Sequence, residues 1–114
     1  MAAKPTQVVR PTKKSEFGIY FATASAQKGW RDIVATFRKP MADTWDFLTR
    51  TPLSRTATNY PLRGELGQIL RGGKTHERWQ HKPTAQGSAR IWFYAEGNRV
   101  MLEQVHTSHP NETK

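Results

Sequence analysis

The sequence predicts an α+β domain in which a strand and a helical hairpin precede a three-stranded antiparallel meander. Apolar side chains recur at helical spacing through residues 24–51. Residues 77–82, 89–94 and 100–106 are rich in the aromatic and β-branched side chains that favour strands. We therefore expect two helices packed on one face of a small sheet.

The composition favours a basic, single-domain protein. The chain has 114 residues and a formal net charge of +9, from 18 lysines and arginines against 9 acids. Such a surface attracts nucleic acid, an anionic membrane or an acidic protein, without choosing among them. The absence of cysteine excludes disulfides and thiolate metal sites. No apolar run approaches the roughly 20 residues of a membrane span, and the start lacks the apolar core of a signal peptide, so we expect a cytoplasmic protein.

The first residues read as a basic arm. Prolines interrupt any regular element there, and no acid precedes Glu16. The cations of the arm are Lys4, Arg10, Lys13 and Lys14. We expect a flexible arm over residues 1–15 and a single folded domain over residues 16–114.

The first strand is expected over residues 17–22, where apolar side chains alternate onto one face. Thr23 or Ser25 is then placed to cap a helix. Pro40 suits the first turn of a second helix. Gly29 weakens the first helix by about 1 kcal/mol relative to alanine, and we interpret it as a point of close packing.

Trp30 and Trp45 lie on the apolar sides of the two helices. We expect both tryptophans to be core residues that hold the hairpin to the sheet. Residues 53–59 then read as a polar connection, and Gly97-Asn98 as the tight turn before the last strand.

The stretch Gly72-Gly73-Lys74-Thr75 ends like a phosphate-binding loop. It lacks the upstream glycine of such a loop, and it leads into a strand rather than a helix. We therefore interpret Gly72-Gly73 as a turn and do not expect a nucleotide-binding loop.

Strand alternation gathers cations on one side of the predicted sheet. In residues 77–82, one face takes Trp79 and His81, and the opposite face takes Arg78, Gln80 and Lys82. In residues 89–94, Ile91 and Phe93 are expected to point at the helices, and the opposite face takes Arg90, Trp92 and Tyr94. A sheet face with several cations suits a polyanion.

Three segments carry a resemblance to a known family. They are Leu62-Arg63-Gly64-Glu65-Leu66, Ala89-Arg90-Ile91-Trp92-Phe93-Tyr94 and Val105-His106-Thr107-Ser108-His109-Pro110-Asn111. With the predicted order of strand, helix, helix and three strands, they make residues 16–114 similar to the RelE/ParE superfamily of bacterial toxin–antitoxin systems. The resemblance implies a RelE/ParE-like fold with the helices on one face of the sheet.

In the RNase branch of that superfamily, the resemblance implies cleavage of mRNA bound in the ribosomal decoding site. Arg90 matches the strand arginine of this branch, and His106 to His109 match its terminal catalytic segment. The chain has no tyrosine after His109, which departs from the RelE pattern and leaves the histidine-based variants of the fold. In the ParE branch, the resemblance implies inhibition of DNA gyrase without nuclease chemistry.

RNA cleavage without a metal needs a base for the 2′-hydroxyl, a cation for the phosphorane-like charge and an acid for the leaving 5′-oxygen. Arg90 is the candidate for the phosphate, because arginine can donate two parallel hydrogen bonds to it. His109 is the candidate acid or base, with His106 as its partner or as a structural group. The candidates for RNA binding are Arg78 and Lys82 beside Arg90, Arg63 for backbone phosphate, and Trp92 for stacking a base or, equally, as a core residue.

Three functions remain open at this point. The leading hypothesis is a toxin that cleaves mRNA on the ribosome, blocks translation and is silenced by a cognate antitoxin. The second is a binding protein of the same fold, which inhibits gyrase or simply binds nucleic acid. The third is an inactive relative. Since no carboxylate or second histidine stands at a recognisable ligand spacing, we expect no metal. We also expect no other cofactor and no small-molecule substrate.

Overall fold

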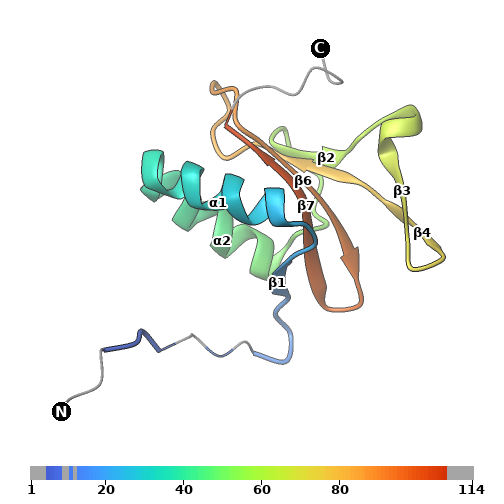
Figure 1. The fold of residues 1–114 in the computed structure, drawn as a ribbon. Coiled ribbons are helices and arrows are strands. Elements are labelled where there is room, and N and C mark those ends of the chain that lie inside the picture. The colour runs from blue at the N-terminus through green and yellow to red at the C-terminus, as the bar shows by residue number, and fades with distance from the viewer. Residues whose placement is uncertain (1–4, 9–10, 12, 108–114) are drawn as a thin grey trace.

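Two helices and two sheets make up the computed structural model, which describes residues 5–8, 11 and 13–107 (Figure 1). In chain order the elements are β1 (Gly18–Phe21), α1 (Ala24–Thr36), α2 (Arg38–Arg50), β2 (Asn59–Pro61), the 3-10 helix η1 (Gly64–Gly67), β3 (Gln68–Arg71), β4 (Lys74–Glu77), β5 (Trp79–His81), β6 (Arg90–Glu96) and β7 (Arg99–His106). The predicted α+β class is confirmed.

The larger sheet has five strands in the order β1-β7-β6-β5-β2. The meander predicted from the sequence is its centre, because β5 pairs antiparallel with β6 and β6 pairs antiparallel with β7. The Gly97-Asn98 turn joins β6 to β7, and Gly97 has a φ of 60°. At one edge β1 runs parallel to β7, and at the other edge β2 pairs antiparallel with β5. The sheet is therefore wider than the predicted meander and of mixed direction.

A second, two-stranded sheet is the antiparallel hairpin of β3 and β4. Its turn is Gly72-Gly73, with φ values of 58° and 77° that favour glycine. The hairpin lies on the side of the main sheet away from the helices (Figure 1). The predicted strand over residues 77–82 is β5, which begins only at Trp79, and its first residue, Glu77, instead ends β4.

The helical hairpin follows the prediction closely. Thr23 caps α1, and its hydroxyl accepts a hydrogen bond from the Ala26 amide. Both helices cover the same face of the main sheet (Figure 1). The core between helices and sheet consists of Ala26, Ile33, Met41, Leu48, Trp79, Ala89, Ile91, Phe93, Val100, Leu102 and Val105.

Gly29 is a point of close approach between α1 and β7. A Cβ atom built on Gly29 would lie 2.1 Å from the carbonyl oxygen of Val105, which is far inside van der Waals contact. The sequence-based interpretation of Gly29 as a close packing point is confirmed.

The prediction that both helical tryptophans are core residues is wrong for one of them. Trp30 packs partly buried against the core, whereas Trp45 is 37% exposed. Thr44, not Trp45, turns inward from this part of α2, where its hydroxyl lies 3.1 Å from Nε2 of His81. Trp45 instead packs edge-on against Trp30, with 6.5 Å between the ring centroids.

The structure describes only some residues of the arm that we predicted over residues 1–15. Residues 5–8, 11 and 13–15 are exposed, and residues 1–4, 9–10 and 12 lie outside the described part of the chain. A flexible basic arm stays a prediction. Neither α1 nor α2 has the length and apolar character that a membrane-crossing helix requires, and the described residues contain no other such candidate.

Candidate nucleic-acid interface

The face of the main sheet away from the helices carries a row of three cross-strand neighbours. Gln80 on β5 pairs with Trp92 on β6, which pairs with Gln104 on β7. Their sequence neighbours Trp79, Ile91 and Phe93 point to the helices and join the core. The alternation predicted for β5 and β6 therefore holds.

Hydrogen bonds hold Gln80 and Trp92 of this row in one arrangement. We call the row of Gln80, Trp92 and Gln104 the platform. The indole Nε1 of Trp92 donates to Oε1 of Gln80 at 2.8 Å, and Nε2 of Gln80 donates to the Tyr60 hydroxyl at 2.9 Å. Because the Gln80 amide uses both its donor and its acceptor, the orientation of both partners is fixed.

Trp92 supports the face without being exposed on it. Trp92 is 1% exposed, which is the core environment that the sequence left open beside base stacking, and a base cannot stack on it in this conformation. The guanidinium of Arg78 lies over the ring, 5.2 Å from its centroid, and His106 meets the ring edge-on at 6.1 Å. The indole therefore positions two of the predicted site residues.

Arg90 stands beside His106, its cross-strand partner in the register of β6 and β7. Its Nη1 donates to the carbonyls of Gly87 and Ala89 at 2.9 and 2.8 Å, which holds the guanidinium in one orientation. The side chain is 7% exposed, and its Nε has no hydrogen-bond partner among the described residues. A buried, unpaired donor is unfavourable in a folded protein, and it is a group that an anion could satisfy.

His106 is oriented by Gln104, which sequence reasoning missed. The ring Nε2 lies 2.7 Å from Oε1 of Gln104. An amide oxygen only accepts hydrogen bonds, so Nε2 is the donor in this bond and carries a proton. The available signal was the spacing of two residues on one strand, which places Gln104 and His106 on the same face.

The remaining predicted cations surround this platform. Lys82 follows β5 directly, and its ammonium lies 5.7 Å from the ring centroid of Tyr60. Arg63 precedes η1 and lines a cavity of about 610 Å³, together with Tyr60 and Gln80. The structure thus gathers Arg78 and His106 at Trp92, with Arg90 across from His106, and Lys82 and Arg63 around Tyr60. His109 lies outside the described residues, so its role stays a prediction.

His81 belongs to the helix side of the sheet and not to this interface. Its Nδ1 lies 3.1 Å from Oδ1 of Asn59 and its Nε2 lies 3.1 Å from the Thr44 hydroxyl. Burial lowers the pKa of His81 to about 4, so the ring is neutral at physiological pH. Nδ1 therefore donates to Asn59 and Nε2 accepts from Thr44. Within residues 5–8, 11 and 13–107, no group of three or more acids or histidines is placed to hold a metal ion.

Comparisons with protein-family models, curated proteins and solved structures each find no match for this chain.

Proposed function

We propose that this protein is a RelE/ParE-like toxin that cleaves mRNA on the ribosome without a metal and is silenced by a cognate antitoxin. The observation that carries the proposal is the placement of Arg78 and His106 at Trp92, with Arg90 across from His106, on the sheet face opposite the helices. This face combines phosphate-binding guanidinium groups with a histidine of fixed orientation.

The arrangement of the elements supports a RelE/ParE-like fold. A helical hairpin packs on one face of a sheet whose centre is an antiparallel meander, and the first strand lies at its edge. The opposite face of the meander carries Arg78 and Arg90 together with the polar Gln80 and Gln104. A net charge of +9 suits RNA, and it also suits an acidic antitoxin segment that would cover the same face.

The proposed chemistry needs no group from outside the protein and the RNA. The 2′-oxygen attacks the phosphorus, the bond from phosphorus to the 5′-oxygen breaks, and a 2′,3′-cyclic phosphate forms. Arg90 stabilises the charge on the phosphate, and Arg78 adds a second positive charge. His106 takes the 2′-hydroxyl proton, and Gln104 holds the His106 ring in its orientation. His109 is the candidate that protonates the leaving 5′-oxygen.

A second function is favoured by one specific observation. Two of the Arg90 hydrogen bonds go to main-chain carbonyls, and the side chain is almost completely buried. An arginine held in this way can shape a cationic surface without touching a reacting phosphate. That arrangement suits a protein of the same fold that inhibits DNA gyrase or binds nucleic acid without cleaving it.

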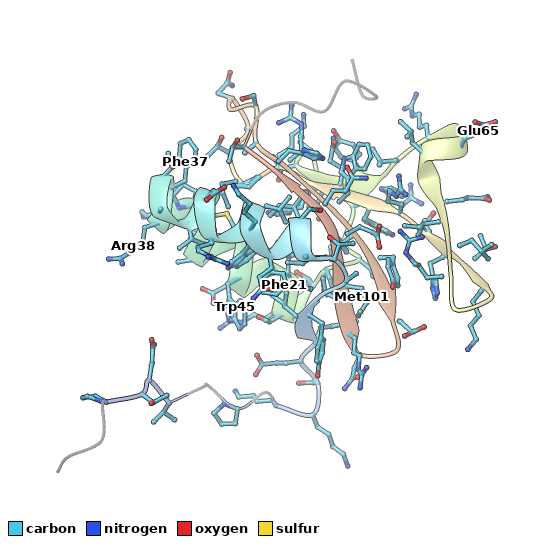
Figure 2. All side chains as sticks on the ribbon, viewed as in Figure 1. Phe21, Phe37, Arg38, Trp45, Glu65 and Met101 are labelled. Atoms are coloured by element: carbon cyan, nitrogen blue, oxygen red, sulfur yellow. The ribbon has the colours of Figure 1, made fainter. Side chains whose placement is uncertain are left out.

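The experiment that tests the proposal maps transcript 5′ ends after induced expression of the wild type, Arg90→Lys, His106→Asn and His109→Ala. Arg38→Ala is the matched control, because Arg38 is an exposed arginine on the helical side of the molecule, opposite Glu65 of η1 (Figure 2). We expect new ends within translated frames for the wild type and Arg38→Ala, and few or none for the other variants.

Circular dichroism of each purified variant separates loss of chemistry from loss of fold. Growth arrest without new RNA ends would contradict the nuclease and favour the gyrase or binding function, which a supercoiling assay then tests. Absence of arrest in the wild type would contradict a toxin of either kind.

A further inference from the structure

The cavity beside Tyr60 is a second feature of the cationic face. It has a volume of about 610 Å³, within the range of about 300–1,000 Å³ that is common for ligand sites. It lies where the loop before β2, β2 itself and the segment leading into η1 come together. The lining residues that matter here are Arg55, Tyr60, Leu62, Arg63, Leu66 and Gln80.

The walls of the cavity combine two kinds of chemistry. Leu62 and Leu66 supply an apolar surface, and the Tyr60 ring adds an aromatic one. Arg55 and Arg63 are exposed arginines at its rim, and no carboxylate belongs to its lining. A ligand that fits both parts has a flat, weakly polar group attached to an anion, which describes a nucleotide.

The cavity is connected by hydrogen bonds to the proposed cleavage face. Gln80 lines the cavity, donates to the Tyr60 hydroxyl at 2.9 Å and accepts from Nε1 of Trp92 at 2.8 Å. Trp92 in turn lies under Arg78 and beside His106. One rigid hydrogen-bonded chain therefore connects the wall of the cavity to the residues that would act on the phosphate.

We propose that this cavity holds one unpaired nucleotide of the bound RNA, close in sequence to the cleaved bond. The base packs against Leu62 and Leu66, and the phosphate of the same nucleotide lies at Arg55 and Arg63. The proposal rests on the proposed RNA-binding function and adds a position at which the protein senses the base. Arg55, which the sequence did not single out, becomes an RNA-binding residue.

The test is a scan of RNA binding by fluorescence anisotropy. The probe is a twelve-nucleotide single-stranded RNA, methylated at every 2′-oxygen to prevent cleavage, in which each position in turn is made abasic. The proteins are the wild type, Arg55→Ala, Leu66→Ala and the control Arg38→Ala. We expect one abasic position, or two adjacent ones, to weaken wild-type binding about tenfold, the size typical of losing one base contact.

The same abasic position should have little effect in Leu66→Ala, because the wall that contacts the base is gone. Arg55→Ala should weaken binding of every probe, and Arg38→Ala should match the wild type. If the abasic effect is equal in the wild type and Leu66→Ala, the cavity does not hold a base and the inference is wrong.

A competition experiment distinguishes RNA from the alternative occupant of the cavity, an acidic protein segment. If an acidic peptide of ten glutamates binds the wild type, loses affinity in Arg55→Ala and leaves RNA binding unchanged, the cavity is a protein-docking site and the inference is overturned. If the protein cleaves mRNA but no abasic position weakens binding, the inference about the cavity is wrong and the proposed nuclease function stands. A base-sensing position in a protein that leaves mRNA intact on ribosomes would support the cavity and contradict the nuclease.

Discussion

The guanidinium of Arg71 and the carboxylate of Glu103 form two contacts, 2.6 Å from Nη2 to Oε1 and 3.1 Å from Nε to Oε2. The pair joins the β3–β4 hairpin to the centre of the main sheet. Glu103 is the extra residue of a bulge in β7, since Trp92 pairs with Gln104 while Phe93 pairs with Leu102. The bulge therefore presents a buried carboxylate to the hairpin.

Replacing Arg71 by alanine is expected to lower the free energy of unfolding by about 2 kcal/mol. The glutamate would remain buried without its partner, and the half-exposed position of Arg71 keeps the loss below that of a fully buried pair. Urea unfolding measures this loss in the free energy of unfolding. The control is Lys28→Ala, which breaks the exposed Lys28–Asp32 pair and should change stability by less than about 1 kcal/mol. Equal losses in the two variants would contradict a structural role for Arg71.

Gly29→Ala should destabilise the protein, although alanine is the better helix former. The new Cβ would overlap the Val105 carbonyl, so α1 must move away from β7, at a loss of about 1–3 kcal/mol. Thermal unfolding of Gly29→Ala beside Ala35→Gly checks this. Ala35 is an exposed position of the same helix, where the change reports helix propensity alone, about 1 kcal/mol. A stabilised Gly29→Ala protein would show that the close contact is absent.

The stability of the protein should fall as the pH drops from about 6.5 to about 4. The pKa of His81 is lowered to about 4 in the folded chain from its ordinary 6.5, so between these values the unfolded chain binds a proton that the folded chain does not. Protons therefore favour unfolding, by about 3 kcal/mol in total from this one group.

Urea unfolding at several pH values measures that slope. In His81→Gln the contribution should disappear, whereas His76→Gln, which keeps His81, should retain it. A slope that is the same in the wild type and His81→Gln would contradict a neutral, buried His81.

The salt dependence of RNA binding should identify the cations that touch phosphate. For single-stranded RNA, the logarithm of the binding constant falls with the logarithm of salt concentration by about 0.7 for each phosphate neutralised. We expect Arg78→Ala and Lys82→Ala each to reduce the slope by about that amount. Arg38→Ala, on the helical side, should leave it unchanged (Figure 2). Slopes that do not differ among the three variants would place the RNA on another surface.

Helices, turns and strand faces can be predicted from the sequence because they depend on neighbours along the chain. The apolar period predicts α1 and α2, Thr23 is a candidate cap, and Gly72-Gly73 has the composition of a turn. Alternation along β5 and β6 places Trp79 and Phe93 toward the core. For the same reason the cationic composition of the opposite face follows from the order of residues alone.

Strand pairing and burial are decided by the tertiary structure. Short β2, β3 and β4 have little periodicity of their own and are defined by the partners they meet across the sheet. Trp45 lies outside the core that it was expected to join, because Thr44 takes the inward position on α2. For Trp92 the sequence left stacking and core open, and the buried hydrogen bond to Gln80 places it inside. Alternation along a strand or helix decides which side chains share a face, but only packing between distant segments decides which of them is covered. The helices and the cations of the sheet face opposite them therefore follow from local pattern, whereas the cavity at Tyr60 and the burial of Trp92 arise only where distant segments meet.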